Sequence, residues 1–275
     1  MASVPSKRVR AREASRDVGA PERLYYRTDG PYRGHAPDFY DGDALAAARR
    51  VVESWKAIRA EYDDNVRRGS DGMKPVFNPA GPSVPGWRSV NLQTYLWRFR
   101  RARKSFPKTA AIIDSTPGLT SAFFNLLEPH SSIPPHEGDS NAIIRFHLGL
   151  DVPPGDCAVR AGSEVRRCAT GEVLAFCDAR NHASWNATDQ PRLVLVFDVI
   201  LPAYRRRMRW ICANVLAATV VIWLEGRLNV LLGQSAEDLH KSGKTIPLPQ
   251  WIRTLLRRSI GVAFHLLLPI QRRLS

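Results

Sequence analysis

The amino-acid sequence predicts a mainly β fold, an antiparallel sandwich or barrel, preceded by helices and followed by a basic, apolar, helical tail. Short apolar or alternating segments recur about every ten residues between positions 118 and 202, with turn residues between them, as all-β folds do. Apolar residues spaced by three and four mark the region before them as helical. Clustered Lys and Arg and two apolar runs distinguish residues 203–275.

Composition excludes several classes of protein. The chain has 275 residues, of which 44% are hydrophobic, so it can bury a core and is not a disordered protein. A mean hydropathy of −0.26 excludes a polytopic membrane protein. Four cysteines, none in a CxxC pair, are too few for a disulfide scaffold and do not form a thiolate zinc motif. Free thiols suit a reducing cytoplasm.

The chain divides into four parts by composition. Residues 1–20 form a basic arm without the apolar stretch of a secretory signal, and we expect it to be disordered. Residues 21–117 are expected to be the helical N-terminal part of a catalytic domain, and residues 118–202 its β core. Residues 203–275 are expected to form a basic amphipathic tail.

Two helices are predicted before the β core. Asp43–Arg67 carries apolar residues at helical spacing, among them Val51, Trp55 and Ile58. A Gly-, Pro- and Ser-rich loop follows over Gly69–Gly86. Pro107–Ser115 is predicted to be a short helix, because proline suits the first turn, where its missing N–H leaves no bond unmade.

Five strands are predicted from the apolar and alternating segments of the core. They are Ala122–Leu127, Ala142–Leu150, Cys157–Ala161, Val173–Phe176 and Leu193–Val199. Clusters of Gly, Pro, Asp and Ser separate them, which favours tight connections between antiparallel strands.

The net charge of +14 is concentrated at the ends of the chain. The arm carries +3 and the tail +9, so the rest of the chain contributes only +2. Ile211–Leu224 and Ile260–Ile270 are apolar and have aromatic or Arg flanks, but each is shorter than the ~20 residues that span a bilayer. We therefore expect the tail to bind an anionic membrane surface without spanning it, and no nucleic acid. The alternative is a pair of helices buried against the main domain.

Two of the four histidines in the β region have informative settings. His136 follows Pro134-Pro135, and His182 lies between the strands Val173–Phe176 and Leu193–Val199. On loops at opposite ends of a sandwich, the two could meet at one metal ion. The spacing alone is equally typical of solvated loop histidines.

The strand between these histidines adds cationic chemistry. In Ala142–Leu150, Arg145 and His147 share one face, while the other face is apolar. Arg192 opens the last strand. An unpaired buried guanidinium is costly, so an anion should sit opposite it. Two arginines and three histidines inside the sandwich therefore suggest a metal and a dianionic small molecule. The alternative is that the arginines pair with internal carboxylates such as Asp178 or Asp198.

Five segments in order resemble the aspartyl/asparaginyl β-hydroxylase family over about residues 85–202. They are Pro135–Gly138 (PHEG), Arg145–Leu150 (RFHLGL), Gly171–Phe176 (GEVLAF), Asn181–Trp185 (NHASW) and Arg192–Val199 (RLVLVFDV). The resemblance implies a double-stranded β-helix, the jelly-roll type. It also implies an iron(II)- and 2-oxoglutarate-dependent dioxygenase that uses O2.

The resemblance assigns the metal ligands. His136 and His182 match the family's two iron ligands and are the expected catalytic pair. Most non-haem iron oxygenases add a carboxylate two residues after the first histidine, but this chain has Gly138 there. A two-histidine site is therefore expected, and Gly138→Asp is expected to supply a third ligand.

The resemblance also assigns co-substrate contacts. Arg192 matches the arginine that binds the distal carboxylate of 2-oxoglutarate. Arg145 and His147 match further contacts on the strand after the first ligand, and Trp87 matches a tryptophan that lines the co-substrate site. Asn125 stands where the family commonly has a serine.

Within the family, the chain is most similar to the bacterial lipid A 2-hydroxylases. Trp55–Arg59, Pro107–Thr109, Asn186–Gln190 and the basic apolar tail carry this similarity. It implies hydroxylation of an unactivated C–H bond of a lipid acyl chain by a cytoplasmic enzyme that is peripheral to, or anchored in, the inner face of a membrane. The alternative is β-hydroxylation of an aspartyl or asparaginyl side chain in a protein, a peptide or a small-molecule pathway.

Overall fold

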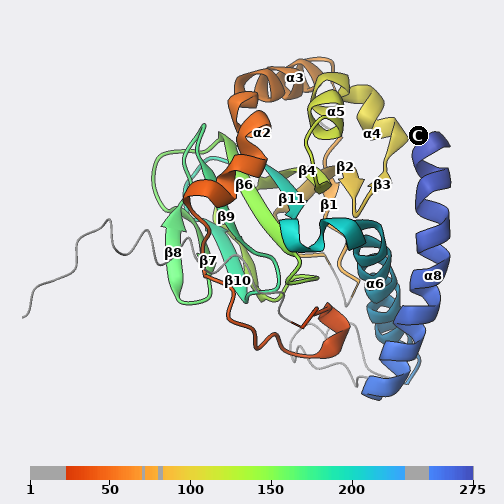
Figure 1. Cartoon of the computed structure of the whole chain (residues 1–275). Helices are drawn as coiled ribbons and strands as arrows, with labels where there is room; N and C mark the ends of the chain where they lie inside the picture. The colour runs from red at the N-terminus through yellow and green to blue at the C-terminus, as the bar shows by residue number, and fades with distance from the viewer. Residues whose placement is uncertain (1–22, 70–71, 80–82, 233–247, 275) are drawn as a thin grey trace, which may run out of the picture.

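The computed structural model describes residues 23–69, 72–79, 83–232 and 248–274, so the arm expected over residues 1–20 lies outside the described residues. Figure 1 shows the whole chain. Before the β core lie η1 (Arg27–Asp29), η2 (Gly42–Ala48), α2 (Arg49–Glu53), α3 (Trp55–Arg67), β1 (Lys74–Pro75), β2 (Trp87–Thr94), β3 (Trp97–Arg98), α4 (Arg100–Ser105) and α5 (Pro107–Asp114).

The β core and the tail follow in the same order along the chain. The core strands are β4 (Leu119–Leu127), β5 (Ser131–His136), β6 (Ile143–Asp151), β7 (Cys157–Ala161), β8 (Glu164–Arg167), β9 (Val173–Cys177), β10 (His182–Asn186) and β11 (Arg192–Ile200). The tail contains η3 (Pro202–Arg207), α6 (Met208–Leu231) and α8 (Gln250–Leu274).

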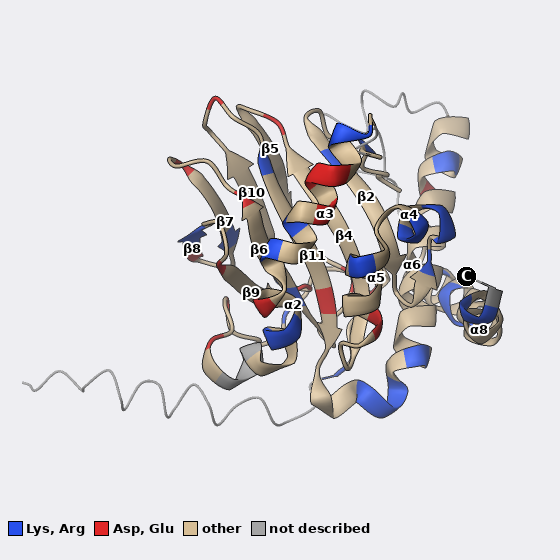
Figure 2. Cartoon of the chain, turned by 90° about the horizontal axis from the view of Figure 1, so that it is seen from above, with Lys and Arg blue, Asp and Glu red and all other residues tan. Residues whose placement is uncertain are grey.

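The strands form two sheets, and the predicted double-stranded β-helix is confirmed. The large sheet has the order β1-β2-β4-β11-β6-β9, with β3 beside β2, and the small sheet has the order β5-β10-β7-β8. All the strand pairs are antiparallel. From β4 to β11 the chain passes back and forth between the two sheets, and seen from above they form two layers (Figure 2). The space between these layers is the interior of the jelly roll.

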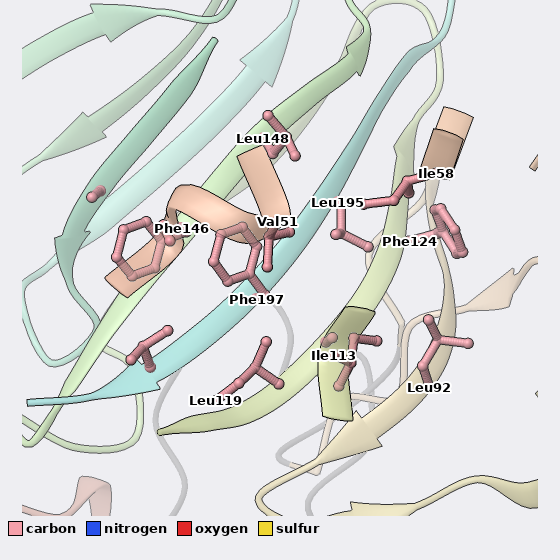
Figure 3. Close-up of a cluster of buried hydrophobic side chains, with 14 of the residues drawn as sticks. Val51, Ile58, Leu92, Ile113, Leu119, Phe124, Phe146, Leu148, Leu195 and Phe197 are labelled. Carbon is pink, nitrogen blue, oxygen red and sulfur yellow. The ribbon is translucent and has the colours of Figure 1, made fainter. Parts of the chain in front are cut away.

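Alternation along the strands gives the large sheet two different faces. Phe146 and Phe197 are fully buried on the outer face and stack with ring centroids 4.8 Å apart. They belong to a core that Val51, Ile58 and Ile113 of the helices complete (Figure 3). Each such side chain contributes about 1.5–3 kcal/mol on burial. Because the helices cover the outer face, the polar residues of these strands are left on the inner face.

The expectation that residues 21–117 are helical is wrong in part. The helix predicted over Asp43–Arg67 is divided into η2, α2 and α3, and α5 begins at Pro107 as predicted. Between these helices, however, β2 pairs with β4 and extends the large sheet. Val90 and Leu92 of β2 join the apolar core of the outer face. The N-terminal part therefore contributes one wall of the jelly roll itself.

The described parts of the tail are helical, as predicted, and the first half of α6 is part of the core. Ile211, Cys212 and Val215 of α6 are fully buried in a cluster with Ile143 and Ile200 of the large sheet. The α6 and α8 helices lie side by side along one flank of the molecule (Figure 1). Of the described helices, the one over Pro202–Leu231 is long and apolar enough to cross a membrane by length and composition, although 61% of its apolar window is buried inside the protein.

Candidate active site

His136 and His182 face each other across two neighbouring strands. His136 is the last residue of β5 and His182 the first of β10, and the two are register partners. Their ring centroids are 4.2 Å apart. The expectation that both lie on loops at opposite ends of the sandwich is therefore wrong. The prolines before His136 are tolerated in β5 because it is an edge strand.

Both imidazoles present the same nitrogen atom. His136 Nδ1 lies 2.9 Å from the carbonyl oxygen of Pro134, and His182 Nδ1 lies 2.8 Å from that of Arg180. A carbonyl only accepts hydrogen bonds, so each Nδ1 carries the hydrogen and each Nε2 keeps its lone pair. Metal-binding histidines are commonly oriented in this way by a bond from their other nitrogen.

Burial keeps these imidazoles neutral. It lowers the pKa of His136 to about 4 and the pKa of His182 well below its usual range, and the positive charge of Arg145 adds to both shifts. Neutral imidazole is the form that binds metal. Across the described part of the chain, no third His, Cys, Asp or Glu joins the pair in a group that could hold a metal ion. The pair therefore fits a two-histidine site.

The position two residues after His136 has no room for a side chain. A Cβ on Gly138 would lie 2.3 Å from both the carbonyl oxygen and Oδ1 of Asp178. The Gly138 N–H donates to the Asp178 carbonyl oxygen at 2.9 Å, and the Asp139 N–H donates to Asp178 Oδ2 at 2.6 Å. The expectation that Gly138→Asp would supply a third ligand is thus wrong, because Asp178 fills that space.

Half of the Arg192 guanidinium has no hydrogen-bond partner. The side chain is fully buried at the start of β11, and its Nη1 donates to Ser184 Oγ of the small sheet at 2.7 Å. Its Nε and Nη2 are buried and have no hydrogen-bond partner. These two atoms form one edge of the guanidinium, the edge that binds a carboxylate in a bidentate manner. The arginine is therefore oriented for an anion inside the jelly roll.

Three more polar atoms on the same face lack partners. They are Asn125 Oδ1, Trp87 Nε1 and His147 Nδ1. Trp87 and Arg192 are both register partners of Leu127, and His147 is the partner of Val196, so strand alternation puts all of them on the inner face. A buried polar atom without a partner costs about 1–3 kcal/mol. These atoms share the inner face with Arg192, and together they suit a small polar ligand such as 2-oxoglutarate.

Arg145 is not placed as such a contact. Its Nη1 lies 2.6 Å from Asp178 Oδ1, and its Nε and Nη2 lie 2.9 and 3.0 Å from the two carboxylate oxygens of Asp198. Both aspartates are fully buried. The alternative pairing with internal carboxylates is the one that the structure shows. Arg145 therefore pairs with two buried aspartates and not with a ligand.

Sequence reasoning missed Ser184 and the role of Asp178. Ser184 lies two residues after His182, so strand alternation could have placed it on the histidine's face of the small sheet. The contact of Asp178 with Gly138 joins two loops that are 40 residues apart in the sequence, and no local pattern signals it.

Comparisons with known proteins identify relatives of this chain. A family model described as aspartyl/asparaginyl beta-hydroxylase matches residues 52–202. An ornithine lipid ester-linked acyl 2-hydroxylase of Rhizobium tropici is 33% identical over 196 residues, which are 68% of this chain and 69% of that protein. The human aspartyl/asparaginyl beta-hydroxylase is 28% identical over 169 residues, which cover 58% of this chain but only 22% of the human protein.

Solved structures give a weaker likeness. A sugar phosphate isomerase of the cupin superfamily from Silicibacter pomeroyi has a TM-score of 0.33 and 16% identity, over 48% of this chain and 74% of that chain. The sequence matches are more extensive. Because the family model spans more than half of the chain and the Rhizobium relative aligns over two thirds of both proteins, the chain belongs to the aspartyl/asparaginyl beta-hydroxylase family.

Proposed function

We propose that this protein is an iron(II)- and 2-oxoglutarate-dependent hydroxylase of a lipid acyl chain at a membrane surface. One observation carries the proposal: a neutral histidine pair with both Nε2 atoms available shares an interior with a buried guanidinium edge that has no partner. The first group suits a divalent metal and the second suits a carboxylate. A metal-chelating dicarboxylate would satisfy both.

The residues divide the work between holding the metal and orienting the co-substrate. His136 and His182 would hold iron(II), which with O2 and 2-oxoglutarate supplies the oxidising power for an unactivated C–H bond. Arg192 binds the distal carboxylate through Nε and Nη2, and Ser184 fixes the plane of its guanidinium. Asn125 Oδ1 and Trp87 Nε1 offer one acceptor and one donor to the bound polar groups. The two sheets enclose the site and exclude water from it.

A lipid substrate is supported by two independent features. The relative from Rhizobium tropici is named as an acyl 2-hydroxylase of a lipid and is similar over two thirds of its length. The tail adds a net charge of +9 and large apolar side chains exposed on α6 and α8, which a hydroxylase of soluble substrates does not need. The second candidate is hydroxylation of an aspartyl or asparaginyl side chain, which the name of the human relative favours.

The test combines co-substrate turnover with product mass. The full chain, loaded anaerobically with iron(II), is given 2-oxoglutarate and O2 with total bacterial lipid or with an Asp- and Asn-containing peptide library. We expect succinate release and a gain of one oxygen atom in a lipid acyl chain. His136→Ala and Arg192→Ala should abolish both. A matched control is His130→Asn, because His130 is exposed, has a φ of 54° and pairs only with Asp189 on the surface.

Three outcomes would contradict the proposal. Oxygen gain in peptides but not in lipid would move the substrate to the second candidate. Turnover that does not depend on 2-oxoglutarate would remove the assigned role of Arg192. Iron uptake at the wild-type level by both His136→Ala and His182→Ala would place the metal elsewhere.

A further inference from the structure

The two tail helices expose large apolar side chains and bury several polar ones. On α8, large apolar side chains point outward at helical spacing, namely Trp251, Leu255, Val262, Leu266 and Ile270. Towards the body of the protein, the same helix buries Arg257, which is 6% exposed. Its inward side also buries Leu268, so α8 is apolar on both sides. A helix on the surface of a water-soluble protein instead exposes a polar face. The exposed side of α8 is therefore built for an apolar surrounding.

The second half of α6 also exposes apolar side chains and buries polar ones. Trp223, Leu228 and Leu231 are exposed, while Glu225 and Asn229 are buried at 3% and 0% exposure. Twelve of the sixteen exposed large apolar side chains in the described residues lie on α6, on α8 or at Leu232 just after α6. Such a concentration is a mark of an interaction site rather than of ordinary surface.

The buried polar groups attach the helix pair to the protein. Arg257 donates to Asn214 Oδ1 at 3.0 Å, and its guanidinium carbon lies 4.1 Å from the ring centroid of Tyr26. Arg253 Nε lies 2.9 Å from Glu225 Oε1. Gln271 exchanges two hydrogen bonds with the backbone of Arg98. Moving either helix alone into a bilayer would separate these pairs in hydrocarbon, at a cost of several kcal/mol for each unpaired group.

The apolar stretch that could span a membrane is already used as core. Ile211, Val215 and Ile222 of α6 are at most 8% exposed and pack inside the protein. On α8, by contrast, the exposed apolar side chains form a stripe along the whole helix, which is about 37 Å long at 1.5 Å per residue. This shape suits the plane of a membrane, with the helix axis parallel to it.

Charge identifies the kind of surface. The only acidic residue of α6 and α8 is the buried Glu225, so every exposed charge on the two helices is cationic. Arg258 and Arg273 are exposed on the same side of α8 as the apolar stripe. Figure 2 shows the basic residues of α8 in blue. Apolar side chains flanked by Arg complement an anionic bilayer interface better than a neutral one.

We infer that the outer side of α8, continued by the last turns of α6, docks in the plane of an anionic membrane. This inference rests on the proposed function, because a lipid substrate lies in a membrane. It identifies the surface of the protein that would contact that membrane. A shallow apolar pocket of about 200 Å³, lined by Phe77, Thr219, Val220 and Trp223, lies beside the exposed Trp223 of this surface.

The test measures binding of the full chain, without iron or 2-oxoglutarate, to vesicles of phosphatidylcholine alone or with phosphatidylglycerol. Truncation at residue 202 is unsuitable, because it would remove the buried half of α6 from the core. We expect sedimentation with the anionic vesicles and release by alkaline carbonate. Leu255→Ser/Leu266→Ser should lower the partition coefficient roughly tenfold or more. Val66→Ser/Val165→Ser, at exposed apolar positions elsewhere, is the matched control.

A second experiment tests the contribution of charge. It compares Arg258→Gln/Arg273→Gln with the control Arg49→Gln/Arg50→Gln on α2. The first pair should weaken binding to anionic vesicles at low salt, and the control should not. A wild-type chain that stays in the supernatant overturns the inference, as does equal loss in the control variants. Resistance to carbonate extraction would show a spanning mode instead, and a dimer that ignores vesicles would show that a second copy covers the face. Binding without lipid hydroxylation would reject the proposed function alone.

Discussion

Asp178 occupies the space in which a side chain of residue 138 would begin: its carbonyl oxygen and its Oδ1 each lie 2.3 Å from the position of a Cβ on Gly138. The same aspartate accepts the N–H groups of residues 138 and 139, immediately after His136. One buried side chain thus fixes the segment that follows His136. Glycine is required here by close packing, since no positive φ is involved.

Gly138→Ala should therefore destabilise the protein and weaken metal binding. Relieving the overlap must shift Asp178 or the segment after His136, and overpacking of this kind costs about 1–3 kcal/mol. Denaturant unfolding and anaerobic Co(II) titration of the histidine site measure the two effects. Gly42→Ala is the control, because a Cβ there meets nothing within 4 Å; its positive φ adds backbone strain but leaves the metal site intact. Co(II) affinity unchanged in Gly138→Ala would contradict the assigned role of Asp178.

Arg192→Met should stabilise the ligand-free protein or leave it unchanged, yet remove its response to 2-oxoglutarate. The wild type buries two guanidinium nitrogen atoms without partners, and replacing such a group by an apolar one of similar volume is often neutral or favourable. With an inert divalent metal bound, 2-oxoglutarate should raise the Tm of the wild type and leave that of Arg192→Met unchanged. An equal rise in both proteins would place the distal carboxylate at another cation.

Ser184→Ala should weaken co-substrate binding without abolishing it. The hydroxyl holds Arg192 Nη1 at 2.7 Å, and its loss frees the guanidinium plane to turn. A hydrogen bond to a charged group contributes about 1.5–3 kcal/mol, so we expect the apparent 2-oxoglutarate requirement to rise roughly ten- to a hundredfold. Ser132→Ala, on the exposed side of β5, serves for comparison. If the two variants have the same 2-oxoglutarate dependence, Ser184 does not orient the arginine.

Arg145→Met should be far more harmful to stability than to co-substrate affinity. It leaves Asp178 and Asp198 buried without their cation, a loss of about 3–5 kcal/mol for a buried ion pair. Denaturant unfolding should show this loss, whereas Asp63→Ala, which removes a partly exposed partner of Arg59, should cost about 1 kcal/mol or less. A stable Arg145→Met protein with a raised 2-oxoglutarate requirement would restore the contact that the family resemblance implied.

The strands with apolar runs were predictable from the sequence, and the two that carry His136 and His182 were not. Segments such as Leu193–Val199 are buried on both faces and show as continuous apolar stretches. The β5 strand contains Pro134-Pro135, which only an edge strand tolerates, and β10 is short and mixed in polarity. Their pairing depends on the closure of the small sheet, which no local pattern encodes.

Within the site, the partners of Arg145 and Arg192 were likewise not predictable from the sequence. Both are cations on inner faces of central strands, and the sequence left open whether each meets a ligand or an internal carboxylate. The answer differs because Asp198 is the register partner of Arg145, while the register partner of Arg192 on β4 is the apolar Leu127. Register between distant strands is a property of the whole sheet, so the distinction emerges only in three dimensions.

The attachment of α8 to the start of the described chain has a consequence for how the protein folds. Gln250 bonds to Thr28 and Arg257 to Asp29, across 222 and 228 residues of sequence. During synthesis, η1 and the β core leave the ribosome well before their partners on α8. The buried polar residues of α6 also emerge before their partners on α8. Contacts this distant form late and slowly. The surface that we propose to dock on a bilayer is therefore complete only when α8 has been made, so a chain stalled before α8 would have its β core but not that surface.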